Sequence, residues 1–241
     1  MRAALILAAT CLLGACNMSA DAQDGGERAA GQVTQRSFNL AGFDSVSLAG
    51  PHDVVVKVGP AHSVRAEGGS AVLDRLEIKV EGGKLEIGTK RGNWSFRNAP
   101  KTTIYVTMPA IRGAAIAGSG DMRIDRAEGK EFSASIGGSG NVEVAALRVG
   151  AADFSVAGSG DIRASGTAGR SNVSIAGSGD VDVSGLESRS AKVSIVGSGN
   201  VRARAMETAE VSIMGSGDVD ISGSAKCSVN KMGSGGVRCG A

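Results

Sequence analysis

Residues 173–183 read Val-Ser-Ile-Ala-Gly-Ser-Gly-Asp-Val-Asp-Val, and this stretch decides the fold because close variants of it recur along the chain. Apolar and polar residues alternate before the Gly-Ser-Gly triplet, and the alternation resumes after it. A period of two is typical of a β-strand with one buried face. The stretch therefore predicts two strands joined at a glycine corner, where a positive backbone φ is tolerated.

The Gly-Ser-Gly triplet occurs seven times, at spacings of 20, 20, 19, 20, 18 and 18 residues. The triplets begin at Gly118, Gly138, Gly158, Gly177, Gly197, Gly215 and Gly233. A repeat of this length cannot bury its apolar face alone, whereas stacked repeats pair each strand with its counterpart in the next one. We predict an all-β fold, a single-stranded parallel β-helix (β-solenoid) with coils of about 18–20 residues.

The residue after each triplet is Asp or Asn in six of the seven repeats. These residues are Asp121, Asn141, Asp161, Asp180, Asn200 and Asp218, and the last repeat has Gly236. Asp beside glycine-rich turns resembles the calcium-binding RTX repeat, but that repeat has a period of about nine residues. We interpret the column as structural, a ladder in which Asp and Asn side chains accept hydrogen bonds from nearby backbone amides.

A second column lies two residues further on and alternates in sign through all seven repeats. It contains Arg123, Glu143, Arg163, Asp182, Arg202, Asp220 and Arg238. Neighbours in adjacent coils are expected about 5 Å apart, where opposite charges attract and like charges repel. Each exposed pair contributes only about 0–1 kcal/mol, but a shift by one coil would bring like charges together. We therefore interpret this column as a structural feature that sets register, not as a ligand track.

The composition excludes several functional classes. The chain has 241 residues, 37 of them Gly, and only 3% are aromatic. Lys and Arg total 26 against 24 Asp and Glu, so the net charge of +2 gives no electrostatic footprint for nucleic acid. A hydrophobic content of 42% is too high for a disordered chain. His52 and His62 are the two histidines, and we predict no catalytic residue, no metal site and no cofactor.

The N-terminus is typical of an exported protein. Residues 1–16 read MRAALILAATCLLGAC, and their apolar run is shorter than the roughly 20 residues of a membrane-spanning helix. The ending LGAC resembles the lipobox of bacterial lipoproteins, which implies lipidation of Cys16 and a membrane anchor; cleavage at residues 20–22 is the alternative. Asn17 favours the outer membrane by resemblance to known sorting patterns. We expect the small, polar residues 17–36 to be a flexible tether.

Cysteine usage agrees with export. Cys11 would leave with the signal and Cys16 would carry lipid, which leaves Cys227 and Cys239 as a pair near the C-terminus. In an oxidising compartment this pair would form a disulfide, and two buried free thiols are the alternative. Lys231 stands in the last repeat where the other repeats have Ile or Val, so we expect this coil to present a polar end.

Residues 37–112 lack the triplet but remain strand-like, with breaks at Gly-Pro and Gly-Gly pairs. We expect them to form the wider, less regular first coils of one solenoid domain, 37–241, in which residues 113–241 hold the seven repeats. One loop in this region combines an aromatic residue with cations. Its Trp94, Arg91 and Arg97 are candidate ligand contacts that would stack on a sugar or a partner protein; an aromatic lid over a solenoid edge is the alternative.

Several motifs follow one another in a characteristic order. They are Phe43-Asp44-Ser45-Val46, Gly50, Val54-Val55-Val56, Gly82-Gly83, Leu85-Glu86-Ile87, Ile104-Tyr105-Val106-Thr107-Met108-Pro109 and Gly118-Ser119-Gly120-Asp121. In this combination the chain is similar to the putative auto-transporter adhesin, head GIN domain family, a bacterial domain of unknown function, over about residues 38–237. The resemblance implies a right-handed parallel β-helix, often on an exported lipoprotein.

Three functions fit these observations. The first is a non-catalytic lipoprotein of the cell envelope that presents its β-helical surface to a glycan or protein ligand, as an adhesin does. The second is a polysaccharide lyase or glycoside hydrolase, because such enzymes also use β-helices, although fold alone does not establish function. The Asp column repeats along the chain and singles out no one pair of carboxylates. The third, a structural spacer, differs from the first only in lacking a ligand. We favour the first.

Overall fold

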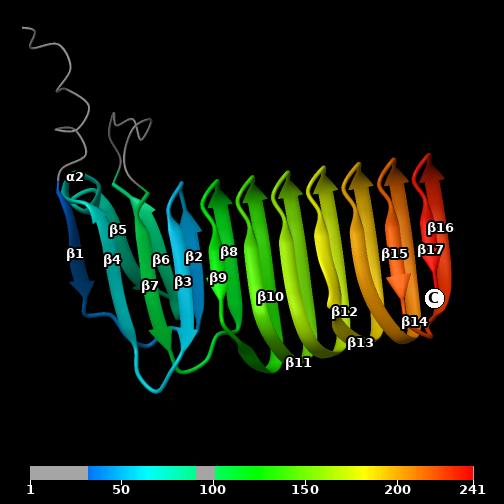
Figure 1. Ribbon diagram of the computed structural model, residues 1–241, viewed down its shortest axis with the longest axis horizontal. Coiled ribbons are helices and arrows are strands. Elements are labelled where there is room, and N and C mark those ends of the chain that lie inside the picture. The colour runs from blue at the N-terminus through cyan, green and yellow to red at the C-terminus, as the bar shows by residue number, and fades with distance from the viewer. Residues whose placement is uncertain (1–31, 91–100, 241) are drawn as a thin grey trace, which may run out of the picture.

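The computed structural model describes residues 32–90 and 101–240 of the chain. Its strands stack along one long axis, with the N-terminal strands at one end and the last coil at the other (Figure 1). The fold is all-β, and the stacked parallel strands form a β-solenoid of about six turns. The predicted parallel β-solenoid is therefore confirmed.

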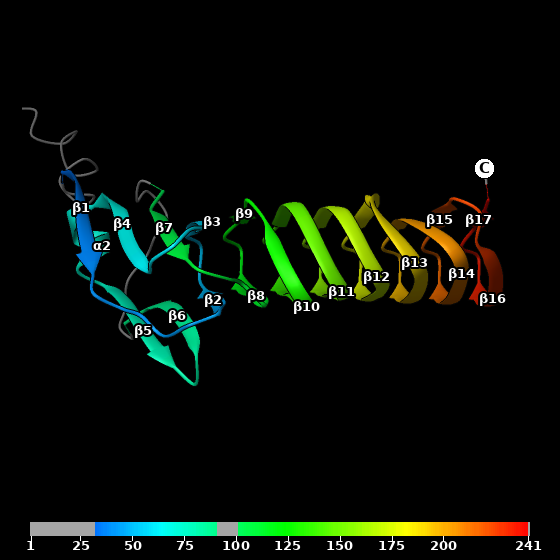
Figure 2. The same ribbon diagram turned by 90° about the horizontal axis from the view of Figure 1, so that it is seen from below.

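Five long strands build the regular part of the solenoid. They are β10 (Ala127–Gly138), β11 (Val142–Gly158), β12 (Ile162–Gly177), β13 (Val181–Gly197) and β14 (Val201–Gly215). Each pairs in parallel with the next, for example Ile136 beside Val156 and Val156 beside Ile175. The strands curve around the stack (Figure 2). Breaks in the two-residue alternation, such as the buried neighbours Ala151 and Ala152, turn the chain from one face to the next.

The core consists of apolar columns that run along the solenoid. One column contains Ile116, Ile136, Val156, Ile175, Ile195 and Ile213, all at most 3% exposed. Each fully buried aliphatic side chain contributes about 1.5–3 kcal/mol, and it is buried only because the coils above and below cover it. Phe132 and Phe154 are the largest fully buried side chains.

Shorter strands continue the stack toward the N-terminus. β2 (Ser45–Ala49) pairs in parallel with β8 (Gly113–Gly118) and β6 (Lys84–Thr89). On another face, β3 (Asp53–Val58) pairs in parallel with β9 (Met122–Ile124) and β7 (Thr103–Met108). At the opposite end, β15 (Val219–Ser222), β16 (Lys226–Gly233) and β17 (Val237–Cys239) complete the last coils.

The N-terminal end departs from the solenoid pattern, which corrects our expectation that residues 37–112 form less regular coils throughout. β1 (Val33–Phe38) and β7 both pair antiparallel with β4 (Ser63–Gly69), and β5 (Leu76–Glu81) pairs antiparallel with β6. One helical turn, α2 (Ser70–Leu73), follows β4. The reason at β5 and β6 is local, because Gly82 and Gly83 have φ of +57° and +77° and fold the two strands into a tight hairpin.

The tether that we expected over residues 17–36 ends earlier than residue 36. Residues 33–36 belong to β1, which pairs with β4 over six residues. The side chains of β1 are mostly exposed, so backbone pairing rather than apolar burial holds this strand. Arg36 adds a side-chain contact, because its guanidinium donates to the Leu73 carbonyl at 2.8 Å and pairs with Asp74.

Candidate functional site

Each regular coil turns its sharpest corner at the Gly-Ser-Gly triplet. The first glycine has a positive φ, +139° at Gly138, and a Cβ there would lie 2.3 Å from the Gly118 carbonyl oxygen. At the third residue of the triplet, close contact with the preceding coil is sufficient to exclude a side chain. A Cβ on Gly140 would lie 2.0 Å from the Gly120 carbonyl oxygen. The Ser139 and Gly140 amides donate to the Gly118 carbonyl of the preceding coil, at 2.9 and 3.2 Å. Glycine therefore lets adjacent corners stack at strand spacing.

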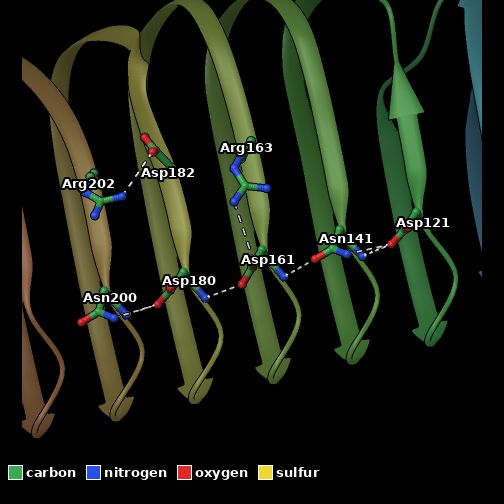
Figure 3. A network of polar contacts seen from close by, with 8 residues as sticks. All are labelled: Asp121, Asn141, Asp161, Arg163, Asp180, Asp182, Asn200 and Arg202. Carbon is green, nitrogen blue, oxygen red and sulfur yellow. Dashed lines mark hydrogen bonds and ion pairs between the residues drawn. The ribbon is translucent and has the colours of Figure 1, made fainter.

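The Asp or Asn after each triplet hydrogen-bonds to its counterpart in the next coil (Figure 3). Asp121 Oδ1 accepts from the Asn141 backbone amide at 3.1 Å and from its Nδ2 at 2.8 Å, and Asn141 Oδ1 accepts from the Asp161 amide at 3.2 Å. Four more such bonds, 2.6–3.1 Å long, join Asp161 to Asp180, Asp180 to Asn200, Asn200 to Asp218, and Asp218 to Gly236. This Asx ladder commits one oxygen of each side chain to backbone amides.

The first corner of the solenoid carries no Gly-Ser-Gly triplet, and the sequence analysis missed it. Gly50 stacks against Gly118, and Asp53 Oδ1 accepts from the Asp121 amide at 3.4 Å. The stretch Gly50-Pro51-His52-Asp53 therefore occupies the position that Gly-Ser-Gly-Asp holds in later coils. A glycine three residues before an Asp at the start of an alternating strand was the available signal, but Pro and His conceal it.

His52 is buried at this first corner, with 3% of its surface exposed. Its Nε2 lies 3.3 Å from Thr89 Oγ1. Burial lowers the pKa of His52 below its ordinary value, and the negative charge of Asp53 opposes that shift more weakly. The imidazole is therefore held neutral by the fold at pH 7, and its protonation works against the native state.

The alternating charged residues from Arg123 to Arg238 lie in register beside the Asx ladder, and we call them the charge ladder. Arg123 pairs with Glu143 at 3.7 Å, and Arg202 pairs with Asp182 at 3.6 Å. Arg163 instead reaches Asp161 of the Asx ladder, at 4.0 Å (Figure 3). These side chains are substantially exposed, so each pair contributes about 0–1 kcal/mol.

Two shallow grooves lie between the ladders. One, of about 200 Å³, is lined by polar residues of the first coils, Asp121, Arg123, Asn141, Glu143, Asp161 and Arg163. The other, of about 350 Å³, is lined near the C-terminus by Asn200, Arg202, Asp218, Asp220 and Arg238. Asp220 and Arg238 are register partners, yet within the described residues no ion pair engages either of them. The second groove thus offers a carboxylate and a guanidinium for hydrogen bonds to a ligand.

The last coil is closed by a disulfide between Cys227 and Cys239, as predicted. Cys227 continues the buried column of Ala209 and Cys239 that of Ile221, so the bond crosses the interior of the coil. Lys231 stands in the column of Ile213, and its Nζ donates to the Gly235 carbonyl at 2.7 Å. A disulfide and a hydrogen-bonded cation therefore cover this end of the core.

One half-buried aromatic contact near the N-terminal end was not predicted. The Arg65 guanidinium lies 4.4 Å from the centre of the Tyr105 ring, and its Nη1 donates to Gln35 at 2.9 Å. Tyr105 is in register with Val55, which in turn is in register with Arg123 of the charge ladder. The alternation of residues 103–108 places Tyr105 outward, and this was the signal in the sequence.

Several predicted residues lie outside the described part of the chain. Trp94, Arg91 and Arg97 are among them, as are Cys16 and residues 17–31 of the expected tether. Within residues 32–90 and 101–240, no group of three or more His, Cys, Asp and Glu side chains is placed to hold a metal ion. The described residues also contain no helix that is long and apolar enough to cross a membrane.

The chain matches a family model over residues 42–225, described as a putative auto-transporter adhesin, head GIN domain. The chain belongs to this family. Its match covers the first corner at Gly50, all the long strands and six of the seven triplets. Among curated proteins, none matches the chain.

Solved structures share the fold of this head GIN domain. A putative adhesin from Bacteroides fragilis NCTC 9343 superposes with a TM-score of 0.82 at 20% identity, covering 88% of this chain and 99% of that one. A putative lipid binding protein from Parabacteroides distasonis ATCC 8503 gives 0.70 at 23% identity, covering 88% and 98%. A putative adhesin from the same strain gives 0.64 at 19% identity, with the same coverage. These likenesses show a shared fold.

Proposed function

We propose that this protein is a non-catalytic, exported lipoprotein whose β-solenoid binds a glycan or protein ligand at the bacterial cell envelope, as an adhesin does. Membership of a family described as an adhesin head domain carries the proposal. The signal-like residues 1–16 support export, and lipid on Cys16 would anchor the chain, most consistently with the outer membrane given Asn17.

The C-terminal groove between the two ladders is the described surface best suited to a ligand. It offers Asp220 and Arg238, which form no ion pair with any residue that the structure describes, beside the exposed amide of Asn200. Carboxylate, guanidinium and amide groups together form hydrogen bonds with sugar hydroxyls and with protein backbones. The loop of Trp94 remains the second candidate, because an indole ring stacks on the apolar face of a sugar.

The arrangement of carboxylates favours binding over glycoside hydrolysis. A hydrolase uses two carboxyl groups with different roles, one protonated and one ionised. Here Asp161 and Asp180 are register neighbours in equivalent positions, and Asp161 Oδ1 accepts the Asp180 amide. Asp180 Oδ1 likewise accepts the Asn200 amide, so each of these carboxylates is engaged by the backbone of the next coil, which supports a structural role for the column. Polysaccharide processing remains the alternative function that the experiment below would reveal.

The test uses the chain without its first 16 residues, so that no lipid is attached. It is mixed with a panel of cell-wall and capsular polysaccharides, and each mixture is measured for binding and for shortening of the polysaccharide. We expect saturable binding without shortening. Arg238→Ala should weaken this binding at least about tenfold if the groove is the site, while Arg148→Ala, on another outward face, is the matched control.

The other possible outcomes of this test would contradict the proposed function or move its binding site. Shortening of any polysaccharide would contradict the non-catalytic function and direct attention to the Asp column. Binding that Arg238→Ala leaves intact but Trp94→Ala abolishes would move the site to the loop. Absence of binding to every polysaccharide would contradict a glycan ligand and favour a protein ligand or a spacer.

A further inference from the structure

From β2 to β16, one outward face of the solenoid carries no charged residue in its two central columns, and the next strand, β6, places Glu86 beside Ser47 at the N-terminal end of this face. The first column contains Ser47, Ala115, Ser135, Ser155, Ser174, Ser194, Ser212 and Asn230, and the second contains Ala49, Ala117, Gly137, Ala157, Ala176, Val196, Met214 and Met232. All sixteen are exposed or half-buried, and we call them the uncharged face. Since 21% of the chain is charged, this depletion resembles the centre of an interface.

The second column of the uncharged face changes in size along the solenoid. Its residues are Ala or Gly from Ala49 to Ala176, and they then become Val196, Met214 and Met232, which are 54%, 56% and 69% exposed. Three exposed apolar side chains in adjacent coils are costly in water. A partner surface that fits this column must be bulky at the N-terminal end and small at the C-terminal end. The same column, running in the opposite direction, has that shape.

We propose that the uncharged face joins two copies of this chain, packed face to face with antiparallel solenoid axes. A two-fold axis that lies in the interface, perpendicular to the solenoid axis, sets each column opposite the same column of the partner. Centred between β11 and β12, it places Ala157 opposite Ala176 of the partner subunit. Val196 then faces Gly137 of the partner subunit, and Met232 faces Ala49 of the partner subunit, so each large residue of the column packs on a small one.

Charges at the border of the uncharged face favour the antiparallel arrangement. The neighbouring column contains Gly113, Ser133, Asp153, Asn172, Lys192 and Glu210. In the antiparallel dimer Lys192 faces a serine, Glu210 a glycine and Asp153 an asparagine, so no like charges meet. In a parallel dimer the column of Lys192 and Glu210 would instead face the column of Val196 and Met214 of the second copy. Lys192 and Glu210 would then lose their hydrating water against these apolar side chains.

The size and ends of the face are consistent with a weak, specific dimer. Eight coils at about 4.8 Å each and three columns give a patch of roughly 34 by 14 Å per copy. The total of about 1,000 Å² is at the lower limit for a specific interface. Beside Ala49, where the β5–β6 hairpin stands out from the stack (Figure 2), a hollow of about 740 Å³ is lined by Glu77, Lys79 and Glu86, and Lys79 pairs with Glu86 at 3.3 Å. It would receive the partner's last coil, which carries Lys226.

Sedimentation velocity over a concentration series, on the chain without its first 16 residues, tests the dimer. We expect a monomer–dimer equilibrium in the micromolar range. Ala157→Arg should raise the dissociation constant at least about tenfold, whereas Ala145→Arg, on a different outward face of β11, should leave it unchanged. A wild-type chain that stays monomeric to about 1 mM, or equal effects of the two substitutions, would overturn the proposal.

A mixing experiment tests the antiparallel arrangement itself. Ala157→Glu and Ala176→Lys should each weaken self-association, because each buries an unpaired charge. In a mixture of the two chains, the new carboxylate faces the new ammonium across the interface, so the hetero-dimer should recover most of the wild-type affinity. Circular dichroism melting of each variant confirms that the fold is retained. A mixture that associates no better than either chain alone would overturn the antiparallel packing.

Discussion

At the scale of single residues, the glycine at the third position of each triplet is required by close contact rather than by backbone freedom. A Cβ on Gly140 would lie 2.0 Å from the Gly120 carbonyl oxygen, a separation that the stacked backbones cannot accommodate without moving apart. Gly137, in the same coil, has 3.8 Å of space to the nearest such atom. The close backbone contact therefore requires glycine at position 140, whereas position 137 has room for a side chain.

We expect Gly140→Ala to destabilise the fold by about 3 kcal/mol or more, because the added methyl group forces two coils apart. Gly137→Ala is the matched control and should be neutral or stabilising by up to about 1 kcal/mol, since Ala restricts the unfolded chain. Urea unfolding followed by circular dichroism measures both. Equal destabilisation by the two substitutions would show that the close contact at Gly140 has no special weight.

His52 makes stability depend on pH in a defined direction. Because burial lowers its pKa in the folded state, its contribution is present above the ordinary value near 6.5 and is lost as the pH falls below that value. We expect the thermal midpoint to fall from pH 7.5 to pH 5.0 by more in the wild-type chain than in His52→Gln. Identical pH profiles for the two chains would exclude this role for His52.

At the scale of the elements, the two ladders explain how identical-looking coils keep their register. The Asx ladder joins each corner to the next by hydrogen bonds of one geometry, which would be equally satisfied after a shift by one coil. The charge ladder is different, because its sign alternates from coil to coil. It therefore distinguishes correct stacking from a one-coil shift, even though each exposed pair is weak.

Asp182→Arg should lower stability by roughly 1 kcal/mol, because it places three guanidinium groups in adjacent coils, at Arg163, position 182 and Arg202. Hydrogen bonds from Ser184 and the charge of Arg202 hold the pKa of Asp182 below its ordinary value, despite the opposing effect of partial burial. Glu131→Arg, an exposed reversal outside the charge ladder, is the control. Thermal melts at low and high salt should show a larger difference at low salt.

At the scale of the whole molecule, the solenoid is a one-dimensional stack whose two ends are protected differently. Antiparallel strands and the β5–β6 hairpin end the stack near the N-terminus. The Cys227–Cys239 disulfide and Lys231 end it near the C-terminus. Since each coil contacts mainly its neighbours, the loss of one end should be felt locally first.

Removing the disulfide with Cys227→Ser and Cys239→Ser should cost about 2–3 kcal/mol, because it frees a short loop in the unfolded chain and unties the last coil. Hydrogen exchange followed by mass spectrometry should show faster exchange in β16 and β17, while β11 and β12 change little. Uniform acceleration across all strands would contradict a locally frayed end.

The sequence by itself determined the β-solenoid, the coil length and the spacing of the Asx and charge ladders, and it favoured a disulfide between Cys227 and Cys239 over the alternative of two free thiols. These follow from the period of two, the spacing of the triplets and cysteine number, all of which are local or repetitive signals. Only the tertiary structure decided that Gly50 to Asp53 forms a first corner, that β1 begins within the expected tether, and that β4 runs antiparallel to β1 and β7. Those features depend on which distant strand lies alongside each segment. Hydrogen bonds between backbones cannot be recognised from the pattern of side chains along the sequence. The uncharged face was likewise decided by stacking, because its sixteen uncharged residues become one surface only when their coils are in register.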